Sequence, residues 1–493
     1  MTFSQKVLTA LGASAVAAIA VLAFAEPDIA DPDLWGSMAM GRETLLRGWP
    51  PAQDPFAYVP TLKPFVYHEW LSGVVFYLLL EYFGSAALKV LMIALGLLTV
   101  GCAARAGRRL GASYLSLLVV LMIALLSMQP GYSPIRAQAF TWLFFALFIL
   151  LLEEGEHGRG RLLLLIPPLT VVWANLHGGF VAGIGLVVLY IVSRLLRGDR
   201  PWRLLGICLA SVLGTLINPY GLRYWRYLHE ALLLPRPRIT EWASLRFDLG
   251  TDWAFKALLL LAALALVIAP RRYWTGVIVM GVTAFLGIRH VRHIPFFSIA
   301  ALAYLPVYLG PLLDRVVASF RARVARRPLT ATVLVGLLLS WLTVAAVLHL
   351  TKITGWKLRV PTSFYPVGAV VFLRLNGLEG NLALPYGWGE YVLWELYPAV
   401  KVSFDGRYET VYPPDVADDN FNFMYGTGDW RRLLQRYPTE MVLVAKDYVM
   451  AHLMEREPGW TKVYEDRISA LYLPTDKSAR FWRLPARADG KIP

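Results

Sequence analysis

The sequence has few charged residues and almost no cysteine. Only 17% of its 493 residues are charged and 57% are hydrophobic, whereas soluble domains average about 25% charged residues. Apolar runs along the whole length exclude a soluble enzyme, and the same hydrophobicity excludes intrinsic disorder. The two cysteines, Cys102 and Cys208, lie inside apolar runs, so we expect neither a disulfide framework nor a zinc cluster.

Several motifs of soluble enzymes and pumps are also missing. The sequence contains no Walker loop, no dinucleotide-binding fingerprint, no H-E-x-x-H zinc motif and no G-x-S-x-G elbow. An ATP-driven pump is therefore not expected. The net charge of +14 does not come from a basic stripe with interleaved aromatic residues, so we expect no nucleic-acid partner.

The sequence does contain about eleven apolar runs, whereas a membrane-spanning helix needs roughly 20 mostly apolar residues. Several runs are shorter, as they are when polar residues extend the helix ends or when helices tilt. They cover residues 7–25, 85–104, 114–128, 138–152, 162–174, 178–193, 203–217, 253–269, 273–288, 294–310 and 329–350. A further apolar stretch from Trp70 to Phe83 is shorter and carries Glu81. We therefore predict a polytopic α-helical membrane protein with about eleven transmembrane helices.

Charge in the short loops orients these helices. If Met1 is cytoplasmic and residues 67–83 do not span, every basic short loop falls on the cytoplasmic side, as the positive-inside rule requires. Those loops are 105–113, 153–161, 194–203, 271–272 and 315–327. We therefore predict an interfacial or re-entrant helix at 67–83 on the outer face and an extracytoplasmic C-terminal segment.

The N-terminal run has two interpretations. The residues Ala23-Phe24-Ala25, followed by Glu26, resemble a signal-peptidase site, and Lys6 gives a short basic start. The apolar region is nevertheless long for a signal peptide. We favour an uncleaved first helix, and the rest of the topology is the same in both cases.

This topology divides the chain into a membrane domain and a water-soluble domain. Residues 1–350 form the membrane domain, with a first outer loop at 26–84, and residues 351–493 form a small extracytoplasmic α/β domain. Its strand-like runs are Leu382–Leu384, Val400–Phe404, Met441–Val444, Lys462–Tyr464 and Ala470–Leu473. Its helical runs are Val367–Leu375, Tyr391–Glu395 and Trp430–Tyr437.

Unusual polar residues gather on the predicted outer face. The first outer loop carries Asp28, Asp31, Asp33, Asp54, His68 and Glu69, and later outer turns carry Arg136, Asn175, His177, Asn218, Arg223, Arg226, Arg289, His290, Arg292 and His293. Acids at the end of a membrane helix are costly near lipid and usually face a water-filled cavity. An aspartate there can act as a general base or hold a metal ion, and clustered arginines suit a phosphate.

Each group also has a simpler structural interpretation. The segment Asp31–Asp33 can be a turn that leads into a helix with an acid at its N-terminus. His177 can satisfy backbone groups where two helices meet, and the outer arginines can anchor lipid headgroups. We interpret Asp405 and Arg407 as a turn with a salt bridge.

Together these motifs resemble the GT-C class of integral-membrane glycosyltransferases. The first loop reads Asp31-Pro32-Asp33-Leu34-Trp35, then Asp54-Pro55-Phe56-Ala57-Tyr58, then His68-Glu69-Trp70-Leu71. The layout is similar to that of the bacterial aminoarabinose transferases and the protein mannosyltransferases. The turns from Trp173 to Gly179 and from Arg292 to Pro295 are shared with a group of poorly characterised bacterial membrane proteins.

The resemblance implies transfer of a sugar from a polyprenyl-phosphate donor to a glycan, lipid or protein acceptor, at the outer face of the bacterial inner membrane. It implies that Asp33, or next Asp31, acts as the base or positions the acceptor, in an inverting displacement. If a divalent ion such as Mg²⁺ or Mn²⁺ takes part, the same two aspartates are its expected ligands.

The remaining polar residues fit the other parts of such a reaction. The expected ligands of the lipid phosphate, which would stabilise the charge of the leaving group, are Arg136, Arg289, Arg292 and His293. The expected acceptor-orienting residues are His68, Glu69, Asn175, His177 and Asp54. We expect the outer arginines to face the first-loop acids across a cavity.

Two other functions stay open. A transporter or lipid flippase often shows inverted repeats and charges near the middle of the bilayer, whereas this sequence has no internal repeat and its charges cluster at one end of the helices. A non-catalytic scaffold on a glycosyltransferase-like fold is the other alternative, because a fold does not fix a function.

Overall fold

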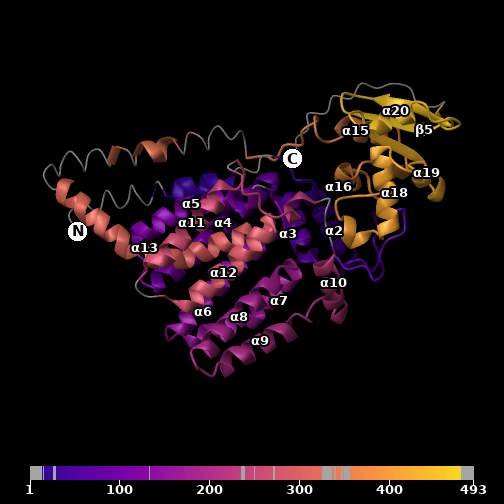
Figure 1. Cartoon of the computed structure of the whole chain (residues 1–493). Helices are drawn as coiled ribbons and strands as arrows, with labels where there is room; N and C mark the ends of the chain where they lie inside the picture. The colour runs from indigo at the N-terminus through magenta and orange to yellow at the C-terminus, as the bar shows by residue number, and fades with distance from the viewer. Residues whose placement is uncertain are drawn as a thin grey trace. The chain divides into compact units, whose positions relative to one another are not determined.

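The computed structural model describes residues 14, 16–25, 29–132, 134–234, 239–248, 250–269, 272–324, 336–337, 340–345, 348 and 356–478 (Figure 1). The start of the first predicted run, residue Asp28 and most of the run 329–350 lie outside this part of the chain. The chain divides into two compact units. Unit 1 comprises Met1–Pro27, Lys89–Gly221 and Leu233–Trp356, and unit 2 comprises Asp28–Leu88, Leu222–Leu232 and Lys357–Pro493.

Unit 1 is built from helices. Its elements are α4 (Ser85–Arg109, of which the first residues belong to unit 2), α5 (Tyr114–Tyr132), α6 (Gln138–Glu156), η1 (Gly160–Leu165), α7 (Ile166–Leu176), α8 (Phe180–Leu196), α9 (Trp202–Gly214), η2 (Thr240–Trp242), α11 (Trp253–Ile268), α12 (Trp274–Arg289), η3 (Val291–His293) and α13 (Ile294–Val324). Each predicted run from 85–104 to 294–310 falls mainly on one of these helices, except 162–174, which covers η1 and α7. Among the described helices, four are long and apolar enough to cross a membrane: Ser85–Arg109, Tyr114–Tyr132, Gln138–Glu156 and Val291–Pro311.

Unit 2 contains three helices from outside the C-terminal segment: α2 (Pro32–Arg47), α3 (Trp70–Phe83) and α10 (Leu222–Leu233, whose last residue belongs to unit 1). The predicted interfacial helix 67–83 corresponds to α3. Helices α2 and α3 pack closely against each other because glycines let their backbones approach. A Cβ atom added to Gly41 of α2 would lie 2.1 Å from the carbonyl oxygen of Gly73 in α3.

Because α2 and α3 approach so closely, a single methyl group added at Gly41 should have a large effect on stability. We expect Gly41→Ala to lower the free energy of unfolding by about 1–3 kcal/mol, the usual cost of overpacking a close contact, because backbone atoms cannot rotate away. The matched control is Gly387→Ala, since a Cβ there meets open space, and it is expected to be neutral or slightly stabilising. Denaturant unfolding of the purified chain in detergent measures both, and equal stability of the two variants would contradict the close packing.

A five-stranded sheet forms the core of the C-terminal part of unit 2. Its strands are β1 (Gly380–Ala383), β2 (Val400–Val402), β3 (Met441–Ala445), β4 (Trp460–Glu465) and β5 (Ser469–Pro474), in the order β2-β1-β3-β5-β4. Strand β1 is parallel to β2 and β3, and β5 is antiparallel to β3 and β4. The helices around it are α15 (Val367–Leu375), α16 (Tyr386–Leu396), α17 (Tyr408–Val411), α18 (Pro414–Tyr425), α19 (Arg432–Arg436) and α20 (Val449–Met454).

The first outer loop adds to the free edge of this sheet. Ala57 forms a parallel bridge with Val402 of the edge strand β2. The N–H of Tyr58 donates to the carbonyl of Val402 at 3.2 Å, and the N–H of Val402 donates to the carbonyl of Phe56 at 3.0 Å. A loop that the sequence groups with the membrane helices therefore forms one compact unit with the C-terminal segment.

Candidate functional site

Helix α2 begins at the acidic segment of the first outer loop. Asp31 is its N-cap residue, and its Oδ1 atom accepts the N–H of Asp33 at 3.1 Å. Pro32 occupies the first helical position and Asp33 lies in the first turn, where an acid interacts favourably with the helix dipole. The structural interpretation of this segment is confirmed, and the two carboxylates lie at one helix start. Their catalytic role stays a prediction.

A buried glutamate from the C-terminal segment lies against the same helix start. Glu390 of α16 is 3% exposed, and its Oε2 atom accepts the N–H of Gly36 at 3.0 Å. A Cβ atom added to Gly406 would lie 2.8 Å from Oε1 of Glu390 and 3.3 Å from Oδ1 of Asp33. Burial raises the pKa of Glu390 well above its usual range, Asp33 and Asp405 raise it further, and a neighbouring guanidinium opposes them. Burial and the two neighbouring carboxylates therefore favour the neutral form of this carboxyl group.

That guanidinium belongs to Arg407, which holds two buried carboxylates. Its Nε and Nη2 atoms donate to Asp405 at 2.9 and 2.6 Å, and its Nη1 atom donates to Asp54. The hydroxyl of Tyr412 donates to Asp405 at 2.6 Å, and the other oxygen of Asp54 accepts the backbone N–H groups of residues 56–57. The predicted salt bridge between Asp405 and Arg407 is confirmed. Asp54, named as an acceptor-orienting candidate, is bound within this network.

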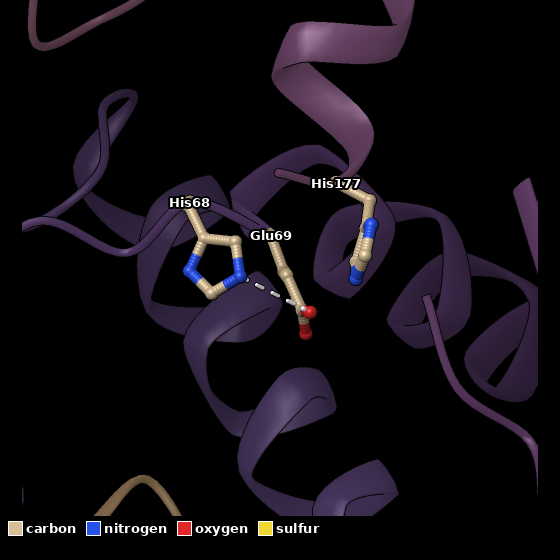
Figure 2. A group of neighbouring side chains, drawn as sticks. All are labelled: His68, Glu69 and His177. Carbon is tan, nitrogen blue, oxygen red and sulfur yellow. Dashed lines mark ion pairs between the residues drawn. The ribbon is translucent and has the colours of Figure 1, made fainter. Parts of the chain in front are cut away.

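His68 and Glu69 form an ion pair just before α3. The Nε2 atom of His68 lies 3.3 Å from Oε1 of Glu69, as the dashed line in Figure 2 marks. The Nδ1 atom of His68 is 3.0 Å from the hydroxyl of Tyr227 in α10. Carboxylates suit Mg²⁺ and Mn²⁺ whereas imidazole suits later transition metals, so the pair offers one oxygen and one nitrogen donor of different preference.

Asn175 and His177 belong to the turn between α7 and α8 in unit 1. The side-chain amide of Asn175 donates to the carbonyl groups of Val171 and Ile217 at 2.8 and 2.9 Å. The Nδ1 atom of His177, labelled in Figure 2, accepts the N–H of Gly179 at 2.9 Å and lies 2.8 Å from the hydroxyl of Thr141. These contacts support the simpler interpretation of His177, which satisfies a backbone group where two helices meet, and Asn175 likewise bonds to backbone groups.

Three of the four predicted phosphate ligands in unit 1 contact the short helix η2. Arg136 pairs with Glu241 at 2.5 Å. The guanidinium of Arg292 lies 4.6 Å from the ring centroid of Trp242, and the ring of His293 lies 5.9 Å from the same indole. Arg289, the fourth predicted phosphate ligand, ends α12. Glu241 and Trp242 of η2 thus contact two arginines that are predicted ligands of the lipid phosphate.

Sequence reasoning named neither Glu390 nor the pair Glu241 and Trp242. The signal for Glu390 is the run Tyr386-Gly387-Trp388-Gly389-Glu390, in which one acid follows aromatic residues and glycines. An acid in such apolar surroundings needs a specific partner. The stretch that carries Glu241 holds no comparable apolar pattern, so local reasoning had no equivalent signal there.

The fold is similar to solved structures of membrane glycosyltransferases. The Archaeoglobus fulgidus oligosaccharyltransferase in the apo form aligns with a TM-score of 0.60 at 10% identity, over 90% of this chain and 69% of that chain. The archaeal oligosaccharyltransferase AglB from the same organism, in complex with an inhibitory peptide and a dolichol-phosphate, gives 0.55 at 11% identity, over the same shares. ArnT from Cupriavidus metallidurans bound to undecaprenyl phosphate gives 0.54 at 15% identity, over 94% of this chain and 98% of that chain.

These neighbours are GT-C glycosyltransferases, so the predicted resemblance to that class is confirmed at the level of the fold. No protein-family model and no curated protein matches the sequence. Together with the four long apolar helices, the fold identifies the chain as a membrane protein. The count of about eleven spans and the bacterial inner membrane stay predictions.

Proposed function

We propose that the chain is a glycosyltransferase that transfers a sugar from a polyprenyl-phosphate donor to an acceptor hydroxyl or amine at the outer face of the membrane. The observation that carries this proposal is the position of Asp33. It lies in the first turn of a helix, beside a group of buried carboxyls, in a fold shared with ArnT, which was solved with undecaprenyl phosphate.

In this reaction the acceptor oxygen or nitrogen attacks the anomeric carbon of the sugar. The bond between that carbon and the phosphate oxygen breaks, and the polyprenyl phosphate leaves with the bonding electrons. The carboxylate of Asp33 takes the proton from the acceptor. The acceptor attacks from the face opposite the phosphate, so this single displacement inverts the configuration at the anomeric carbon. Asp31 is the second candidate, although its Oδ1 atom already caps α2.

The basic residues of unit 1 are the proposed ligands of the lipid phosphate. Arg136 and Arg292 carry planar guanidinium groups that match phosphate oxygens, and Arg289 and His293 lie at the adjoining end of α12 and in η3. Charge on the departing phosphate is stabilised most by donors that are already fixed in place. The contact of Arg292 with the indole of Trp242 supplies such fixation.

The proposed reaction can proceed with or without a bound divalent ion. Asp31 and Asp33 offer carboxylate oxygens at the start of α2, and His68 and Glu69 offer a nitrogen and an oxygen before α3. Bound near the leaving group, an ion would neutralise phosphate charge. The residues of the chain bind and orient the substrates in either case.

A transfer assay with a labelled polyprenyl-phosphate sugar tests the function. We expect the purified chain in lipid nanodiscs to transfer label to membrane acceptors, with and without added Mn²⁺ or Mg²⁺. Arg292→Gln is expected to reduce kcat/KM for the donor about 10- to 100-fold, the size of one lost hydrogen bond to a charged group. The matched control is Arg197→Gln, which breaks an ion pair with Glu156 elsewhere in unit 1 and should leave transfer unchanged.

Other outcomes would contradict the proposal in distinct ways. Transfer from a nucleotide sugar but not from the lipid-linked sugar would exclude the proposed donor. Movement of the labelled lipid across the bilayer without transfer would favour the flippase alternative. Neither transfer nor movement with any donor would favour the scaffold.

A further inference from the structure

We propose that Glu390 is a positioning residue that fixes the start of helix α2 and thereby places Asp33 for the reaction. This inference rests on the proposed function, because it names a residue in the C-terminal segment on which the acidic site depends. It goes beyond that function because it makes the C-terminal segment part of the catalytic unit.

The carboxyl group of Glu390 occupies a space that two glycines leave open. A Cβ atom on Gly36 would lie 2.4 Å from Oε2 of Glu390, and one on Gly406 would lie 2.8 Å from Oε1. These two glycines come from separate segments, and each must lack a side chain for the carboxyl group to reach the α2 backbone. Gly389, which precedes Glu390 in α16, lets that helix approach a third segment, because a Cβ atom there would lie 2.1 Å from the carbonyl oxygen of Phe404.

The two helices that Glu390 joins pack along their length. Helices α2 and α16 lie side by side (Figure 1). Trp35 of α2 is 1% exposed, and its ring lies 5.2 Å from that of Tyr391 in α16. Arg42 of α2 donates to the carbonyl of Trp394 at 3.3 Å and stacks on its indole. The aromatic packing fixes the helices laterally, while Glu390 bonds to the backbone one turn from the acids.

Each carboxyl oxygen of Glu390 has a defined neighbour in the packing of α2 against α16. Oε2 accepts the N–H of Gly36, and Oε1 lies beside Gly406, where Oδ1 of Asp33 also approaches. The groups that act on Glu390 electrostatically are Asp33, Asp405 and Arg407, and Tyr67 and Tyr365 also interact with it. Arg407 is itself bound by two aspartates. The contact of Glu390 with α2 is a hydrogen bond from the neutral N–H of Gly36, so the α2 backbone requires an acceptor oxygen at this place rather than a charge.

The position of α2 bears directly on catalysis. A general base works only within hydrogen-bond reach of the proton that it takes, and a displacement of about 1 Å can cost about 100-fold in rate. A residue that fixes the first two turns of α2 therefore controls kcat without touching the substrate.

Hydrogen exchange of the full chain in nanodiscs tests the contact without any activity. We expect Glu390→Ala to speed exchange of the amides of residues 33–40 roughly fivefold, as the loss of one hydrogen bond predicts. Glu390→Gln keeps an acceptor oxygen and should exchange as the wild type does. The matched control is Glu395→Ala in the same helix, whose partner is the exposed Arg374, and it should leave the exchange of residues 33–40 unchanged.

The transfer assay on the same variants tests the consequence. We expect Glu390→Ala to lower kcat up to about 100-fold with an unchanged donor KM, and Glu390→Gln to restore most of the activity. A wild-type exchange rate in Glu390→Ala would overturn the proposal. So would a Glu390→Gln variant as inactive as Asp33→Asn, since the carboxyl would then react itself. If the wild type transfers no sugar while the exchange results hold, the proposed function fails and the contact stands.

Discussion

Replacing Asp33 with asparagine is expected to lower kcat for sugar transfer about 10²–10⁴-fold, the contribution of a positioned general base. Asparagine has the size of aspartate and keeps its hydrogen-bonding shape, but it cannot accept the proton of the acceptor. The KM for the lipid donor should not change, because the proposed phosphate ligands are other residues, in unit 1. Initial rates over a range of donor concentrations separate the two constants.

Asp31→Asn is the matched control for this prediction. Asp31 caps α2 through its Oδ1 atom, and asparagine caps a helix about as well as aspartate does. The variant should therefore fold normally and lose less activity than Asp33→Asn. Full activity in both variants would remove the first-loop acids as the base. Faster amide exchange across α2 in Asp33→Asn would assign its defect to folding instead.

Where a local pattern decides the structure, the sequence was sufficient to predict it. The helical run Val367–Leu375 coincides with α15, and the strand-like run Met441–Val444 lies in β3, whose residues are all buried. Helix α18 was missed because Pro414–Tyr425 contains three aspartates and two asparagines, which are poor helix formers. It forms because its apolar residues, among them Val416 and Phe423, are buried.

The acidic site was predicted only in part because its contacts join distant segments. The aspartates after the first helix were visible from their position in the sequence. Their neighbours were not, since Glu390 and Gly36 are separated by 354 positions, and Arg407 and Asp54 by 353. Rules based on hydrophobic periodicity and residue spacing relate residues within about one helical turn or one hairpin. The packing of α2 against α16 and the pairing of the first loop with the edge of the sheet bring these residues together.

Arg407→Met is expected to destabilise the chain by about 3–5 kcal/mol, because removing one partner of a buried ion pair leaves uncompensated charge. The side chain of Arg407 is 4% exposed, and those of Asp54 and Asp405 are fully buried. Methionine keeps much of the apolar stem of arginine. The loss of stability therefore reflects mainly the two carboxylates that are left without a cation. Denaturant unfolding of the purified chain, followed by tryptophan fluorescence, measures it.

A second pair in the same unit provides the matched control. Arg431 is half-exposed and binds Glu457 at 2.8 Å, so Arg431→Met should change stability by no more than about 1 kcal/mol. Adding Asp54→Asn and Asp405→Asn to Arg407→Met should recover part of the lost stability, because it removes the uncompensated charges. Equal stability of the two single arginine variants would mean that the Arg407 network is open to solvent. In that case the ion pairs of Arg407 would not be what holds the first loop against the sheet.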